Sequence, residues 1–335
     1  MEAIMCPQCN APLAPPKFAR FVVCSYCGAT VQLDESSVSA EIFHKAFQLW
    51  NSPETYRISS WFSIGTSHWV LDKYIANGDI SDVYAGQRAR WPTELAVIKL
   101  LRDRQGVALF ENEWEVLQRL QRSEAPGFDI FTTLIPQPIL HGEITGGSNT
   151  GQRVNIYRWA SGFRYNFEEV LQAYPQGISP KASVWVWRRI LEILSFLHHS
   201  GIAHGAILPS HLLVQENDHG VRLVGYSAAG PFGKKLANIS PRDESFYPKA
   251  HSSLTAPLDL IMSARCVITI LGGNPKIGSL PRTVPLKLAR LIQRIALTNP
   301  VDLEKHDAWS IREELGGIAR EIFGPPQFNP IVMPA

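Results

Sequence analysis

The sequence predicts an α+β chain with a small cysteine-rich module, a β-rich region and a larger helical region. Two C-x-x-C pairs lie in the first 27 residues. Short β-type runs then dominate up to about residue 158, and apolar residues at helical spacing dominate the rest. With 335 residues and 45% hydrophobic composition, the chain can bury a full core and should divide into more than one structural unit.

Charge and composition argue against several classes of protein. The 32 basic and 30 acidic side chains give a net charge of +2, so the whole-protein field does not favour nucleic acid or an anionic membrane. No apolar run reaches the roughly 18 residues of a membrane helix, and the first residues lack a signal-peptide pattern. We therefore expect a cytoplasmic protein without membrane contact, in a reducing setting where paired cysteines usually bind metal.

The cysteine pairs predict a metal site in residues 1–33. Cys6 and Cys9 form the first pair and Cys24 and Cys27 the second, and each is followed by a residue that tolerates positive φ. Four thiolates close a tetrahedral shell, so the ion should be a structural Zn²⁺ that supplies roughly 10 to 16 kcal/mol of folding energy. The alternative is four unrelated buried thiols. The segment resembles a zinc ribbon, a family that binds proteins or nucleic acids.

Residues 34–67 predict a linker that contains one amphipathic helix. Apolar residues recur at helical spacing between Val38 and Trp50. This stripe either packs on the next domain or is free for a partner, and we favour the first reading.

Residues 68–158 predict strands and one helix. Trp69–Ile75 is a β-type run that leads into a turn at Gly78. Lys99 ends a buried apolar strand, where a cation needs a carboxylate or phosphate partner. On the helix expected at 110–120, only one of three glutamates, Glu113, falls within the apolar arc. We therefore expect Glu113 to pair with Lys99.

Residues 159–324 predict mainly helices, followed by an extended tail at 325–335. Asn166 should cap a short helix, with Glu169 as its reciprocal partner. A long helix is expected from Lys181 to about Ser200, and another begins at Asp259. Between them, Gly201–His211 contains neither a carboxylate nor a basic side chain other than histidine.

The region from Trp69 to Gly324 resembles the protein kinase superfamily. Leu95–Lys99 matches the V-A-I-K strand, and His204 and Pro209 match positions of the catalytic loop H-R-D-x-x-x-x-N. The resemblance implies a bilobal fold with a small β-rich lobe at 68–158 and a large helical lobe at 159–324. It also implies that Gly78, Lys99 and Glu113 would be the nucleotide-binding positions.

The positions that carry kinase chemistry are altered. The resemblance places Ala206 at the catalytic aspartate, His211 at the magnesium-binding asparagine and Gly225 at the aspartate of D-F-G. Asp259 stands where kinases keep an aspartate that braces the catalytic loop through backbone N–H groups. These positions predict a retained scaffold without the catalytic groups, a pseudokinase.

Three functions follow as hypotheses. The first is a pseudokinase that binds or scaffolds a protein partner, with ATP binding compatible in the absence of Mg²⁺. The second is an active kinase-like or other nucleotide-transferring enzyme with relocated metal ligands, drawn from Asp79, Asp82, Asp243 or His211. The third is a nucleic-acid-binding regulator that uses the ribbon, whose basic residues Lys17 and Arg20 give it little support.

One further ion pair is expected. Kinases join a glutamate of the A-P-E motif to an arginine near the end of the large lobe. Lys249 and Glu304 stand at about these positions with reversed charges. We expect them to approach within roughly 4 Å.

Overall fold

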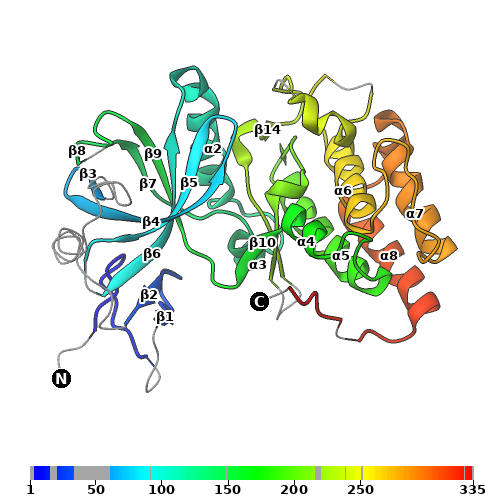
Figure 1. Cartoon of the computed structure of the whole chain (residues 1–335), viewed down its shortest axis with the longest axis horizontal. Coiled ribbons are helices and arrows are strands. Elements are labelled where there is room, and N and C mark those ends of the chain that lie inside the picture. The colour runs from blue at the N-terminus through cyan, green and yellow to red at the C-terminus, as the bar shows by residue number, and fades with distance from the viewer. Residues whose placement is uncertain are drawn as a thin grey trace. The chain divides into compact units, whose positions relative to one another are not determined.

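The computed structural model describes residues 4–15, 21–33, 61–90, 92–147, 149–215, 220–237, 239–249, 252–327 and 329–333. The chain divides into two compact units, which are described separately (Figure 1). The first comprises residues 1–114 and 137–161, and the second comprises residues 115–136 and 162–335. The helix predicted between Val38 and Trp50 lies outside the described residues.

Among the described residues, the first unit is built on a nine-stranded sheet with the order β1-β2-β6-β5-β4-β3-β8, in which β9 pairs with β6 and β7. Its strands are β1 (Phe21–Val23), β2 (Thr30–Gln32), β3 (Trp61–Ile64), β4 (Ser67–Asn77), β5 (Ser81–Arg88), β6 (Thr93–Leu101), β7 (Pro138–Glu143), β8 (Gly146–Gly147) and β9 (Arg153–Arg158). Alternate side chains of the central strands meet in one core, formed by Phe62, Trp69, Ala96, Ile98, Leu100, Ile144, Val154 and Ile156.

A helix follows the central strand β6. It is α2 (Val107–Leu120), which begins after the 3₁₀ turn η1 (Arg104–Gly106). Asp103 caps that turn by accepting from the backbone N–H of Gln105. Phe110 is fully buried, and its carbonyl accepts from Asn155 Nδ2 on β9 at 3.0 Å. The helix is therefore fastened to the sheet by both packing and a buried hydrogen bond.

The cysteine-rich segment is continuous with this sheet. β2 pairs with β6 through Val31 and Glu94, and through Gln32 and Thr93. Arg88 on β5 adds a second link, because its Nη1 donates to the carbonyl oxygen of Pro7 at 2.9 Å. The spacing of the cysteines gave no indication of this pairing.

The second unit is mainly helical. Its helices are α3 (Phe128–Phe131), η2 (Thr132–Leu134), α4 (Phe167–Ala173), α5 (Pro180–His199), η3 (Pro209–His211), η4 (Tyr226–Ala228), η5 (Pro241–Phe246), α6 (Ala256–Ile270), α7 (Leu286–Leu297), η6 (Pro300–Leu303) and α8 (Ala308–Phe323). Its short strands are β10 (Phe163–Asn166), β11 (Ile202–Ala203), β12 (Leu212–Gln215), β13 (Gly220–Leu223) and β14 (Gly230–Pro231). They form the sheets β10-β12-β13 and β11-β14.

The helix α6 forms the centre of the second unit. It is mostly apolar and almost fully buried, as expected for a helix that is surrounded by other elements. It contacts α5 and α7, and α5 also packs against α8. The structure confirms the capping box of Asn166 and Glu169 at the start of α4. None of the helices in the described ranges is long and apolar enough to cross a membrane.

Candidate functional site

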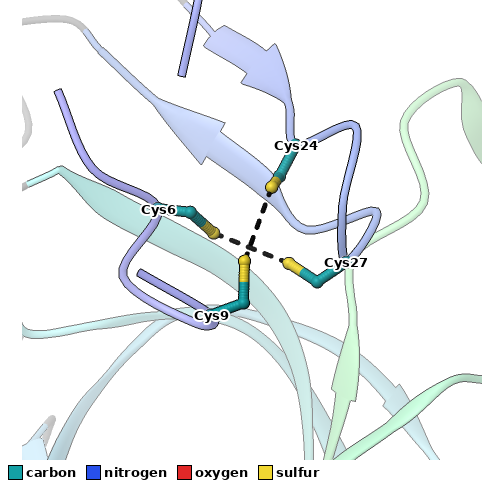
Figure 2. Close-up of side chains that lie close together, drawn as sticks. All are labelled: Cys6, Cys9, Cys24 and Cys27. Atoms are coloured by element: carbon teal, nitrogen blue, oxygen red, sulfur yellow. Dashed lines mark hydrogen bonds between the residues drawn. The ribbon is translucent and has the colours of Figure 1, made fainter. Parts of the chain in front are cut away.

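Four cysteine side chains converge in the first unit (Figure 2). Their sulfur atoms all lie within 4.8 Å of one another. The Sγ atoms of Cys6 and Cys27 are 3.6 Å apart, and those of Cys9 and Cys24 are 3.7 Å apart. These thiols are free, since a disulfide requires about 2.05 Å. Sulfurs placed about 2.3 Å from a tetrahedral ion would lie about 3.8 Å from one another, so the cluster can hold a metal ion.

Two matching turns produce this convergence. The backbone N–H of Asn10 donates to the carbonyl of Cys6 at 2.9 Å, and that of Gly28 donates to Cys24 at 2.7 Å. Asn10 has φ 59° and Gly28 has φ 69°, which confirms the positive φ predicted at both positions. Burial raises the pKa of the Cys6 and Cys27 thiols. Burial acts in the same direction on Cys24, but backbone N–H groups of its own turn and the neighbouring thiols lower the pKa of Cys24 to about 7. A thiol of this kind is readily converted to the thiolate that metals bind.

A buried carboxylate lies where the cysteine-rich segment joins β6. Glu94 is fully buried, and its Oε2 lies 3.4 Å from Nη1 of Arg88. Burial raises the pKa of Glu94, while the charges of Arg88 and Arg158 lower it only in part. The junction therefore contains a carboxylate whose ionised form is disfavoured by burial, receives no hydrogen bond from the described residues and is only partly stabilised by the two arginine charges.

The second cluster is the ion pair of Lys99 and Glu113. Lys99 Nζ on β6 donates to both oxygens of Glu113 on α2, at 2.8 and 2.9 Å. Glu113 is 2% exposed, and its negative charge is one cause that raises the pKa of Tyr157, after burial. The predicted partner of Lys99 is thus confirmed. The pair satisfies both charges within the first unit.

The turn between β4 and β5 is held by an arginine that the sequence analysis did not identify. Arg102, just after β6, donates through Nη2 to the carbonyl oxygens of Gly78 at 2.5 Å and Asp79 at 3.1 Å. Its Nη1 donates to Asp82 Oδ1 at 3.2 Å and to Asn77 Oδ1. The carbonyl of Gly78, one of the expected nucleotide-binding positions, is therefore occupied, and its N–H donates to the carbonyl oxygen of Ser81 at 2.9 Å. The charge of Asp82 is compensated. No local periodicity signals an arginine in this role.

In the second unit, a buried aspartate braces the loop after β11. Asp259 on α6 is fully buried, and its two oxygens accept from the backbone N–H groups of His204 and Gly205 at 2.8 Å each. His198 Nε2 lies 3.1 Å from the same carboxylate. Tyr247 completes the brace by donating its hydroxyl to the carbonyl oxygen of Gly205 at 3.0 Å. The brace predicted for Asp259 is confirmed.

The side chain of His211 fills the space beside Gly225. His211 Nδ1 donates to the carbonyl oxygen of Ala206 at 2.8 Å. Gly225 has φ 82°, and a Cβ at this position would lie 2.6 Å from Nε2 of His211. Both the backbone conformation and the imidazole therefore oppose a side chain at Gly225. The loop therefore keeps the hydrogen bonds from its backbone to Asp259. At the altered positions its side chains are a methyl group at Ala206 and the imidazole of His211, which lies beside Gly225.

Comparison with known proteins identifies the fold. No protein-family model matches the sequence, and no curated protein matches it. The crystal structure of the BubR1 kinase domain matches with a TM-score of 0.57 and 15% sequence identity, over 84% of this chain and 91% of that one. The chain has a protein-kinase-like fold. At this identity the likeness concerns the fold alone, so the roles of residues must come from the geometry of the chain itself.

The expected ion pair between Lys249 and Glu304 is wrong. Both side chains are exposed, and the ion pairs among the described residues do not join them. Arg265 on α6 fastens this segment instead, by donating to the carbonyl oxygen of Tyr247 at 2.6 Å. It also donates to that of Ala296 at 3.0 Å. The segment is therefore held by charge-assisted hydrogen bonds from a buried arginine.

Proposed function

We propose that this protein is a pseudokinase, a kinase-like scaffold that binds a protein partner and does not transfer phosphate. The observation that carries the proposal is the contact between His211 and Gly225. The imidazole fills the volume that a metal-binding side chain at Gly225 would need, and Ala206 offers no acceptor for a substrate proton. Loss of a general base alone lowers a rate by about 10² to 10⁴. Kinases turn over at about 1 to 100 s⁻¹ and also depend on bound magnesium.

We further propose that the four cysteines bind one structural Zn²⁺ and that the ribbon forms part of the surface for the partner. A closed set of four sulfur ligands leaves no open position for substrate. The intact pair of Lys99 and Glu113 supports a scaffolding role, because a satisfied ion pair stabilises the first unit whether or not nucleotide binds. Binding of ATP without Mg²⁺ is compatible with this assignment.

The alternative of an enzyme with relocated ligands has less support. Within the described residues, the cysteine cluster forms the single group of three or more side chains that can hold a metal ion. Asp82 is paired with Arg102, and Asp243 with the neighbouring Arg242. Two of the three carboxylates named as substitutes are thus already engaged in local contacts.

A labelled-ATP assay tests the proposal. We expect no phosphotransfer above background for the wild type and for Lys99→Ala alike. Activity that is present in the wild type and lost in Lys99→Ala would overturn the assignment. A thermal-shift titration with ATP, with and without Mg²⁺, should give the same small shift or none in both conditions. Metal analysis of the purified chain should find one zinc per molecule.

A further inference from the structure

A small pocket lies within the second unit, between α5, α8 and the chain that follows α8. Its volume is about 150 Å³, which matches cavities that hold one benzene-sized ring. Trp185, Phe323 and Pro325 form part of an apolar wall. Asn329, which also lines the pocket, is tied to α5, because Trp185 Nε1 donates to the carbonyl oxygen of Asn329 at 2.9 Å.

Three cationic side chains line this pocket, and its lining among the described residues contains no carboxylate. The cations are Lys181 and Arg188 on α5 and Arg320 on α8. Within the described residues, none of the three forms an ion pair. Lys181 Nζ instead lies 5.9 Å from the ring centre of Phe323. The pocket therefore carries three positive charges that form no ion pair among the described residues, beside aromatic surface.

The two carboxylates that act on Arg188 are already paired with other arginines, and Glu313 contacts Arg312. Glu192 binds Arg189 at 2.7 Å and Arg312 at 2.7 Å, so it is shared between two other arginines. Arg188 lies across α8 at Gly316, where a Cβ would be 3.6 Å from its Nη1. Burial lowers the pKa of Arg188 and the charge of Arg312 lowers it further, while the charges of Glu192 and Glu313 offset these effects only in part. A bound anion would relieve both effects.

We propose that this pocket binds a small phosphomonoester, with the phosphate on the arginines and the organic group on Trp185 and Phe323. A phosphate dianion complements three cations, and guanidinium groups bind its oxygens in a bidentate manner. The volume admits one ring-sized group, and the aromatic wall suits an aryl ester. The ligand is either a free aryl phosphate or a phosphotyrosine side chain of a peptide. This inference does not depend on the assignment as a pseudokinase.

Calorimetric titration of the full chain tests the proposal. Phenyl phosphate should bind more tightly than inorganic phosphate, and phenol should not bind. A phosphotyrosine peptide that binds more tightly than phenyl phosphate identifies the peptide as the source, and weaker binding identifies the free ester. Arg188→Gln and Arg320→Gln should each weaken phenyl phosphate by about tenfold or more, because a hydrogen bond between charged groups is lost. Arg290→Gln on α7 is the matched control, since Arg290 is exposed and outside the pocket, and it should leave binding unchanged.

Several outcomes would overturn the proposal. These are no binding of phenyl phosphate at millimolar concentration, equal affinity for phenyl phosphate and inorganic sulfate, or full binding by both arginine variants. Binding confined to phosphatidylserine-containing vesicles or to a DNA duplex would assign the cations to another class of ligand. Circular dichroism must show that each variant is folded. Because Arg320 is exposed, Arg320→Gln keeps the test decisive even if Arg188→Gln destabilises the chain.

Discussion

The contact between His211 and Gly225 predicts an unusually large effect of a single methyl group. In Gly225→Ala, a non-glycine residue must adopt φ 82°, which costs about 1 to 2 kcal/mol. The new Cβ would also lie 2.6 Å from the imidazole, and overpacking of this kind adds about 1 to 3 kcal/mol. We therefore expect Gly225→Ala to lower the free energy of unfolding by about 2 to 5 kcal/mol.

Urea unfolding followed by circular dichroism measures this loss. Gly233→Ala is the matched control, because Gly233 has φ 83° but no atom within 4 Å of the added Cβ. Gly233→Ala should lower the free energy of unfolding only by the cost of the positive φ, about 1 to 2 kcal/mol. In a His211→Ala background the steric part should disappear, which gives a coupling of about 1 to 3 kcal/mol in the double-mutant cycle. The reasoning is refuted if Gly225→Ala costs no more than Gly233→Ala, or if His211→Ala leaves its cost unchanged.

Four other perturbations have defined outcomes. Asp259→Asn should lower the free energy of unfolding by about 3 to 5 kcal/mol, because two buried N–H groups lose a charged acceptor; a loss below about 1 kcal/mol in urea would contradict the brace. Lys99→Met should cost a similar amount at pH 7 by leaving Glu113 buried without its cation, and adding Glu113→Gln should recover most of it. Metal release to a chelator, followed with a metal-sensitive dye, should be faster at pH 5.5 than at pH 7.5, because thiolates must be protonated to leave; equal rates would argue against thiolate ligands. The pKa of Glu94 is raised above its ordinary value of 4.5 in the folded state, so its contribution to stability is present below pH 4.5 and lost as the pH rises through the folded-state value. Glu94→Gln should therefore gain stability relative to the wild type as the pH rises above 4.5, and a difference that does not change with pH would exclude the titration.

Local patterns were sufficient where a contact depends on spacing along one element. Glu113 could be chosen from three glutamates because only its position falls on the buried side of α2, and the observed contact with Lys99 follows. The cysteine spacing likewise predicts a cluster, since each turn needs only four residues and a positive φ. Asp259 was found through the resemblance rather than through spacing, because its partners lie far away in the chain.

Contacts between distant segments could not be predicted in the same way. The pairing of β2 with β6 joins Val31 to Glu94. Neither residue type indicates which other strand its own strand will pair with. The position of Arg102 depends on where the turn at Gly78 lies in space. For Lys249 and Glu304 the sequence predicted a contact that does not form. The prediction rested on the positions of two charges along the sequence and took no account of the buried Arg265.

The pairing of β2 with β6 also bears on how the chain avoids self-association. β2 covers the backbone of β6 at Thr93 and Glu94, next to the stretch that β9 covers. If the thiolates lost their ion and β2 came away, β6 would present unpaired N–H and C=O groups beside a strand edge. An edge of this kind recruits strands from other molecules. An ion at the cysteines would then protect the protein from aggregation by keeping β2 paired with β6, although β6 itself supplies no ligand to the ion.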